Sequence, residues 1–133
     1  MEGRSAFQYT ILRVVPSVER GERLNAGVVL YCPEERFIGA RVDLDAERLR
    51  ALAPDMDAEP LRPHLAALAA IAEGDESAGP LARLSPSERF GWIAAPSSTV
   101  VQPSAVHTGL CDDPGRMLEH LFSTLVLRPE SRS

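Results

Sequence analysis

The residues that could carry chemistry gather where a charged connection enters an apolar segment. The connection, residues 20–23, reads Arg-Gly-Glu-Arg and leads to Asn25, the only asparagine of the chain. An asparagine side chain at such an entry can bond to the backbone or to a ligand. Arginine offers a planar fork that binds carboxylate or phosphate through paired hydrogen bonds. The candidate binding residues are Arg13, Arg20, Glu22, Asn25, Arg41 and Arg89.

Two interpretations of these candidates stay open. In the first they are structural, with Glu22 paired to a neighbouring arginine and Asn25 closing the turn. In the second they form a polar recognition site in which Arg13, Arg41 or Arg89 binds an anion through two parallel hydrogen bonds. The two interpretations differ in whether the arginines face one another across the fold.

Several catalytic mechanisms are excluded because the chain has 14 arginines and no lysine. A P-loop needs a lysine on the phosphates, a Schiff-base enzyme needs a lysine amine, and a Ser–Lys dyad needs a lysine base. No Gly-x-Ser-x-Gly elbow and no dinucleotide-binding glycine pattern occurs in the sequence. We therefore expect no catalytic residues and no cofactor, and an enzyme is the less favoured class.

Metal ligation is also not expected. None of the three histidines is followed by another four residues later, and neither Cys32 nor Cys111 belongs to a CxxC or Cys/His pattern. Asp112 and Asp113 are acidic neighbours, but Asp113 beside Pro114 is explained by capping a helix. We expect both cysteines to be reduced, structural thiols.

The charge distribution argues against nucleic acid as a partner. The formal net charge is −5, and the excess of acids lies entirely in residues 45–80. Nucleic-acid binding needs clustered positive charge instead. The first residues lack a hydrophobic signal region, and the longest apolar run, 26–32, is far too short to cross a membrane. We expect a soluble cytoplasmic protein with no membrane association.

Three strands are predicted in the first third of the chain. Residues 6–15 mix aromatic and β-branched types and end at Pro16. Residues 24–32 are apolar on both faces, which is typical of a central strand, and Gly27 within them indicates a bulge or a close backbone approach. A turn at 33–36 leads into a strand at 37–42, so the two form a hairpin. In the first strand one face carries Phe7, Tyr9, Ile11 and Arg13.

The rest of the chain is mostly helical by its pattern. Asp45 can cap a helix through Leu52, a second helix can begin at Pro60 or Pro63, and residues 73–80 are a loop. A capping box opens a third helix, a strand over 98–102 ends at Pro103, and a last helix begins after Asp113. The residues that carry these patterns are the stripe Leu61, Leu65, Leu68 and Ala72, the box Ser85–Glu88, and the stripe Met117, Leu118, Leu121, Phe122 and Leu125.

This order of elements predicts an α+β fold in which helices pack on an antiparallel or mixed sheet. The length suits one domain with a hydrophobic core. We place that domain at residues 6–127 and expect flexible termini at 1–5 and 128–133.

Two segments of the chain resemble a bacterial family catalogued as domain of unknown function 3037. The first runs Tyr-Thr-Ile-Leu-Arg-Val-Val-Pro over 9–16, and the second runs from Gly21 to Leu30. Later pieces are similar too: Arg89 near Trp92, residues 100–104, and Asp113-Pro114 opening a helix. The resemblance covers roughly residues 6–126. It implies a context, because members of the family are often encoded beside proteins similar to HipA-like kinases.

Two hypotheses about function follow. The first is a non-catalytic accessory or interaction protein of the bacterial cytoplasm that binds a protein partner, which the resemblance suggests is a HipA-like kinase. The second is a small-molecule or phosphate-ligand-binding domain, or a cryptic enzyme, built on Arg13, Glu22, Asn25, Arg41 and Arg89. A homo-oligomer remains open under either hypothesis.

Overall fold

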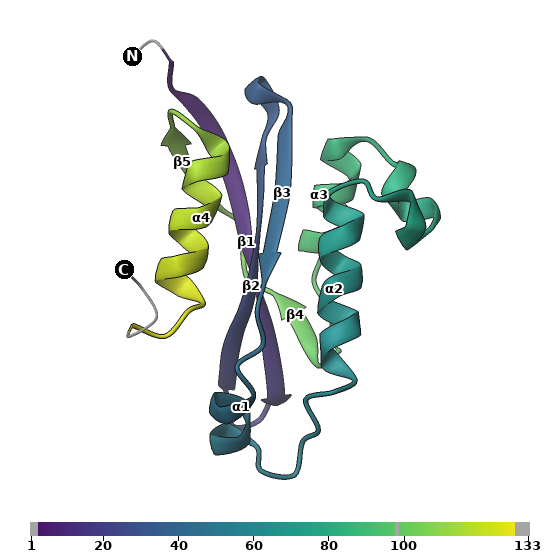
Figure 1. Ribbon diagram of the computed structural model, residues 1–133, viewed down its shortest axis with the longest axis vertical. Coiled ribbons are helices and arrows are strands. Elements are labelled where there is room, and N and C mark those ends of the chain that lie inside the picture. Colours follow the sequence, from purple (N-terminus) through teal and green to yellow (C-terminus); the bar gives the residue numbers. More distant parts are fainter. Residues whose placement is uncertain (1–2, 98, 130–133) are drawn as a thin grey trace.

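A long antiparallel hairpin forms the centre of the molecule. The computed structural model describes residues 3–97 and 99–129. Strand β1 (Ser5–Ser17) pairs with β2 (Glu22–Cys32), from Gln8 opposite Tyr31 to Ser17 opposite Glu22. Figure 1 shows three layers, with this hairpin in the middle, α4 on one face and α2 and α3 on the other.

The sheet has five strands, and every pairing is antiparallel. β3 (Phe37–Val42) lies beside β2, which is central as the sequence predicts. The other side of β1 is shared by two short strands, β4 (Val101–Pro103) and β5 (His107–Cys111). The single domain is therefore α+β with an antiparallel sheet, and the predicted fold class is confirmed.

Pro16 does not end the first strand, contrary to the prediction. The pairing of β1 with β2 shifts register between Val14 and Ser17, so Pro16 falls in an irregularity of the ladder. Proline has no backbone N–H to donate, and at this irregular position Pro16 removes no regular hydrogen bond of the ladder. Val15 next to it donates its backbone N–H to the carbonyl of Val100 at 2.7 Å, which ties this end of β1 to the residue preceding β4.

Gly27 marks a bulge in β2, as expected. Arg13 lies opposite Asn25 while Leu12 lies opposite Gly27, so Ala26 is the extra residue. The backbone of β3 also comes close, since a Cβ on Gly27 would stand 3.0 Å from the carbonyl oxygen of Arg41. The bulge changes which residues of β2 face which helix layer, and both faces of β2 become part of the core.

Local signals set the helix ends. Asp45 accepts a hydrogen bond from the backbone of Arg48 at the start of α1 (Ala46–Leu52), and Asp113 caps α4 (Pro114–Leu125) in the same way. The predicted capping box of Ser85 and Glu88 opens α3 (Pro86–Ala94). The helix α2 (Leu61–Ala72) begins directly after Pro60, and short 3-10 turns at Glu76–Ala78 and Pro80–Arg83 follow it.

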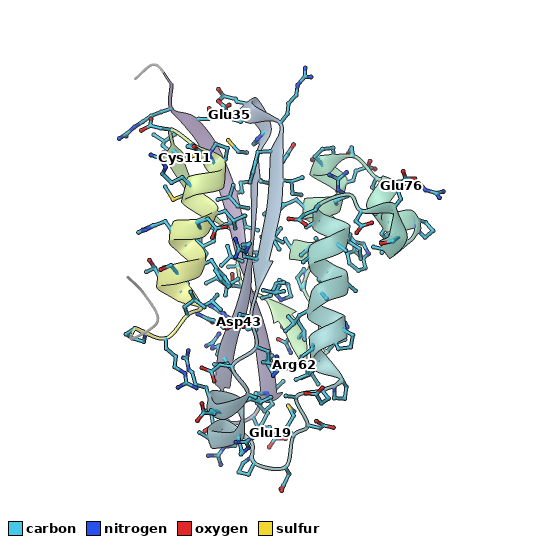
Figure 2. All side chains as sticks on the ribbon, in the orientation of Figure 1. Glu19, Glu35, Asp43, Arg62, Glu76 and Cys111 are labelled. Carbon is cyan, nitrogen blue, oxygen red and sulfur yellow. The ribbon has the colours of Figure 1, made fainter. Side chains whose placement is uncertain are left out.

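The core lies on both faces of the hairpin. The α2 and α3 side buries residues such as Leu12, Val29, Leu65 and Phe90. The α4 side buries a separate group. Figure 2 shows the side chains filling both spaces, while labelled acidic residues such as Glu35 and Glu76 lie at the periphery. The buried residues of the α4 side are Phe7, Val28, Leu30, Cys32, Cys111, Leu118, Phe122 and Val126.

The predicted strand over 98–102 is wrong in its bounds. β4 covers only Val101–Pro103, Thr99 and Val100 precede it as a bend, and Ser98 lies outside the described residues. Pro103 is part of the strand because β4 is at the edge of the sheet, where a proline is tolerated. β5 was not predicted, since His-Thr-Gly-Leu-Cys has little hydrophobic alternation.

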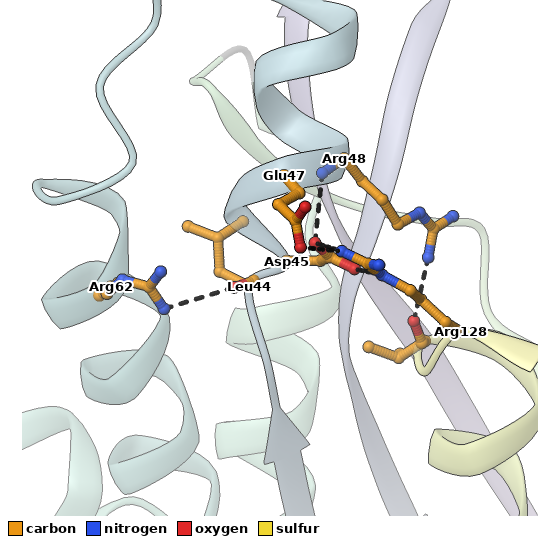
Figure 3. Close-up of polar contacts among 7 residues, drawn as sticks. Leu44, Asp45, Glu47, Arg48, Arg62 and Arg128 are labelled. Atoms are coloured by element: carbon orange, nitrogen blue, oxygen red, sulfur yellow. Dashed lines mark hydrogen bonds and ion pairs between the residues drawn. The ribbon is translucent and has the colours of Figure 1, made fainter. Parts of the chain in front are cut away.

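Two residues that the sequence analysis placed in the terminal segments make specific contacts. Ser5 is buried in β1, and its hydroxyl donates to the carboxylate of Glu35 at 3.1 Å. Arg128 binds Asp45 with two nitrogens and Glu47 at 3.0 Å, as Figure 3 shows. The start of β1 is thus fixed to the turn between β2 and β3, and the residues after α4 are fixed to the start of α1.

Candidate functional site

Arg20 and Glu22 form a local ion pair in the turn between β1 and β2. The guanidinium donates to both carboxylate oxygens, at 2.8 and 3.3 Å. These hydrogen bonds lower the pKa of Glu22 and raise that of Arg20. The pairing of Glu22 with a neighbouring arginine was one of the two sequence interpretations, and both residues are engaged with each other.

Asn25 serves the end of a helix. Its side-chain amide donates to the carbonyl of Leu125 at 2.9 Å, and Leu125 is the last residue of α4. Such a bond satisfies one of the carbonyls that a helix leaves unpaired at its end. Asn25 therefore links β2 to α4 over a long sequence separation and does not close the turn as the structural interpretation expected.

Arg41 and Arg89 lie on opposite sides of the sheet. Arg41 on β3 pairs with Glu119 of α4, and its guanidinium lies 5.2 Å from the ring centre of Phe122. Arg89 on α3 donates to the carbonyls of Ala72 and Leu84, at 3.2 and 2.6 Å. Arg89 thus holds the end of α2 against α3 and takes no part in a site shared with Arg41.

Arg13 differs from the other candidates because no described residue accepts a hydrogen bond from its side chain. Its Nε is buried and unpaired among the described residues. Burial lowers the pKa of Arg13, and repulsion by Arg23 lowers it further. Arg13 lies opposite Asn25, so it faces α4, away from Arg89. The structure does not bring the six candidates into one site.

A different feature has the properties of a binding surface: the sheet edge formed by β4 and β5. Among the described strands, β1 is the only neighbour of either. The outer backbone groups of such an edge are free to pair with another strand. We call residues 101–111, with Trp92 and Val100 beside them, the neutral edge.

The neutral edge contains no Asp, Glu, Arg or Lys, and His107 is its only basic residue. No Asp, Glu, Arg or Lys occurs anywhere from Phe90 to Cys111. The opposite edge strand, β3, instead contains Arg41 and is followed by Asp43. Proteins commonly place charges on edge strands to prevent pairing with other chains. The absence of charge leaves the edge at β4 and β5 open to such pairing.

Exposed apolar side chains gather along the neutral edge. Five large hydrophobic residues of the described chain are exposed, and four of them are Trp92, Val100, Val106 and Leu110. Their exposed fractions range from 39% for Val100 to 58% for Leu110. The fifth, Val18, lies in the turn between β1 and β2. Exposed apolar residues grouped in this way mark interaction sites more often than scattered ones do.

A hollow of about 350 Å³ lies beside β4 on the α2 and α3 side. It could receive an apolar side chain, because its walls are almost entirely uncharged. Its lining comes from β1, α2, α3 and β4 and from the residues between α3 and β4: Leu12, His64, Leu68, Trp92, Ile93, Ala95, Pro96, Ser97, Thr99, Val101 and Pro103.

The connection between β4 and β5 is fixed to the middle of β1. Ser104 is buried, and its hydroxyl oxygen accepts a hydrogen bond from the backbone N–H of Ile11 at 2.9 Å. The hydroxyl of Thr10 donates to the carbonyl of Ser104 at 2.9 Å. Further along, the rings of Tyr9 and His107 stack at 5.0 Å. Hydrogen bonds and ring stacking thus fix the neutral edge to β1.

The match to a family model includes all these elements. The model described as "Protein of unknown function (DUF3037)" matches residues 9–126, from within β1 to just past the end of α4. The chain belongs to the DUF3037 family. No curated protein and no solved structure matches it.

In this DUF3037 chain the two cysteines face the α4 layer. Both are free and buried, and burial next to Cys32 raises the pKa of the Cys111 thiol to about 11. Cys111 ends β5 beside α4 (Figure 2). Such a thiol is a poor nucleophile at neutral pH.

Within 3–97 and 99–129 no group of three or more His, Cys, Asp or Glu side chains could hold a metal ion. The helices of the same ranges are too short or too polar to cross a membrane.

Sequence reasoning missed the neutral edge because it searched for polar residues. One signal was present: the uncharged stretch from Phe90 to Cys111 in a chain with 25% charged residues. Trp92 and the valines in that stretch could then have been considered as surface residues. What the sequence could not show is that the stretch forms one sheet edge.

Proposed function

We propose that this DUF3037 protein is an interaction module of the bacterial cytoplasm, and that its neutral edge binds an extended segment of a protein partner. One observation carries the proposal: an edge without Asp, Glu, Arg or Lys has four exposed large apolar side chains. Strand addition to such an edge uses backbone hydrogen bonds for affinity and apolar contacts for specificity.

The lack of acidic residues and arginines on the edge limits which side chains the partner segment can carry. A charged side chain buried against Val106 or Leu110 would lose hydration without gaining an ion pair. The partner segment is therefore extended, uncharged and apolar on alternate residues. An apolar side chain of the partner, next to this segment, enters the hollow beside Trp92.

The proposed partner is a HipA-like kinase. Support for this choice comes from the family resemblance, because members of that family are often encoded beside such proteins. In this role the DUF3037 chain acts as a non-catalytic companion and uses no cofactor. Its acidic middle segment, residues 45–80, gives no support to nucleic acid as a partner.

A ligand site made of the six arginine, glutamate and asparagine candidates is not supported. Arg89 faces away from Arg13, and Asn25, Arg20, Glu22 and Arg41 are bonded within the chain. The catalytic version of that hypothesis has no further observation behind it. Arg13 alone among the six has no hydrogen-bond partner for its side chain among the described residues.

Co-purification tests the proposed function. The tagged full chain is expressed in its native host and with a HipA-like kinase of the same genome, and its mass in solution is measured alone. We expect a monomer that retains the kinase. A chain that retains no partner contradicts the proposal, and so does a stable dimer that Leu110→Lys dissociates, because a second copy would then occupy the edge.

A further inference from the structure

The face of the sheet that carries α4 is only partly covered by that helix. α4 ends at Leu125, where Asn25 binds its carbonyl, and Figure 1 shows β1 and β2 continuing past the helix. Arg13 lies opposite Asn25 on β2 and opposite Gln102 on β4, so the three side chains share this face. Arg23, two residues before Asn25, faces the same way.

Arg13 stands out among the arginines because its Nε is buried without an acceptor among the described residues, and Arg23 lies close enough to repel it. Neither forms a hydrogen bond or ion pair through its side chain with the described residues, although Arg13 is half-buried. Other arginines show the usual arrangement, in which an acidic side chain lies within 4 Å. These paired arginines are Arg4, Arg20, Arg41, Arg62, Arg83 and Arg128.

Two adjacent guanidinium groups without an acceptor are unfavourable for the fold. Repulsion from Arg23 adds to the cost of burying Arg13, and both effects lower the pKa of Arg13. A buried polar group that lacks a partner needs an explanation. An anion between the two arginines would remove both penalties at once.

A small hollow lies beside Arg23 and Gln102; Arg13 is the partner of Gln102 in the pairing of β1 with β4 but does not itself line the hollow. It has a volume of about 180 Å³ and is lined by Val15, Val18, Gly21, Glu22, Arg23 and Gln102. Ligand pockets for larger molecules begin at roughly 300 Å³. The carboxylate of Glu22 in this lining is neutralised by Arg20, so the local charge of the group is positive.

We propose that Arg13, Arg23 and Gln102 form a binding site for an oxyanion of the phosphate class. The two arginines supply charge and N–H forks, which suit a tetrahedral oxyanion better than a lysine would. The amide of Gln102 donates to the carbonyl of Thr99 at 2.9 Å and has a second N–H for the ligand. Gln102 belongs to β4 of the neutral edge, but it shares the α4 face with Arg13, and the proposal does not depend on the partner proposed for that edge.

The test is a titration of the full chain with inorganic phosphate, in which amide NMR chemical shifts report binding. Sodium chloride at matched ionic strength is the reference for screening, and acetate is the carboxylate reference. We expect saturable shifts at Arg13, Arg23 and Gln102, with affinity reduced about ten-fold or more in Arg13→Gln and in Arg23→Gln. Arg36→Gln, at the opposite end of β2, keeps the wild-type affinity within about two-fold.

Three outcomes overturn the proposal: no saturable shift beyond that of chloride, unchanged affinity in both arginine variants, or acetate binding as tightly as phosphate. Arg23 is exposed, so Arg23→Gln remains a valid test even if Arg13→Gln does not fold. Arg13→Lys adds a second measurement, because it keeps the charge and loses the fork. We expect Arg13→Lys to bind phosphate more weakly than the wild type.

Discussion

The ring of Phe7 lies against the backbone of Gly109, and a Cβ atom at position 109 would stand 2.7 Å from Cζ of the ring. The two residues are partners in the pairing of β1 with β5. Phe7 is buried in the α4 layer, so the contact joins the neutral edge to the core. The position of β5 therefore depends on the absence of a side chain at residue 109.

Gly109→Ala is expected to destabilise the protein. The new methyl group overlaps a buried ring that has little room to move, and overpacking of this kind costs about 1–3 kcal/mol. Urea unfolding measures the change. The matched control is Gly91→Ala in α3, where nothing lies within 4 Å and alanine is the better helix former. Equal stability of the two variants would contradict the packing described for β5.

Ser104→Ala is expected to loosen the connection between β4 and β5. It leaves the backbone N–H of Ile11 without its acceptor inside the protein, which costs about 1–3 kcal/mol. Faster amide exchange at Ile11 and in β5 should accompany the loss. Ser87→Ala, on the exposed surface of α3, is the control and should change little. Unchanged exchange in β5 would show that Ser104 does not hold the edge.

The ion pair between Asp45 and Arg128 should make stability depend on acid pH. Hydrogen bonds from Arg128 and from the backbone of Arg48 lower the pKa of Asp45 from 3.8 to about 2. Because the folded pKa is the lower one, the charged form stabilises the fold above pH 3.8, and this contribution is lost as the pH falls towards 2.

Asp45→Asn isolates this charge effect, since asparagine still caps a helix well. We expect the variant to be less stable than the wild type at neutral pH and the difference to shrink between pH 3.8 and pH 2. Unfolding by urea at a series of pH values measures it. A difference that stays constant over this range would show that the carboxylate does not titrate as described.

The thiols should be unreactive in the folded protein. Both are buried, and the raised pKa of Cys111, about 11, leaves little thiolate at neutral pH. A thiol-specific reagent should label them only as fast as the protein opens, and should label both rapidly in denaturant. Rapid labelling of the native protein would contradict their place in the α4 layer.

The sequence predicted those features whose causes are local. The capping residues Asp113 and Ser85 act within one helical turn, so the starts of α4 and α3 were readable. The ion pair of Arg20 with Glu22 spans two residues, and pairing of Glu22 with a neighbouring arginine was one of the two interpretations that the sequence left open. The apolar character of residues 24–32 correctly indicated a central strand.

Features that depend on distant contacts were missed. β5 pairs with the distant strand β1, where Phe7 packs on Gly109, and Asn25 binds the carbonyl of Leu125; no local pattern reveals either contact. The same reason separates Arg41 from Arg89: the first belongs to the α4 face and the second to the α3 layer. The arginine count indicated the chemistry available, but only the topology shows which arginines remain without an acidic partner.

The most direct test of the account compares partner affinity in charge-insertion variants. Val106→Lys and Leu110→Lys place a charge on exposed positions of the neutral edge, while Val18→Lys changes an even more exposed valine elsewhere. We predict that both edge variants fold and bind the HipA-like kinase about ten-fold more weakly or worse, and that Val18→Lys binds like the wild type. Wild-type affinity in both edge variants, or equal loss in all three, would contradict the assignment of the neutral edge as the binding surface.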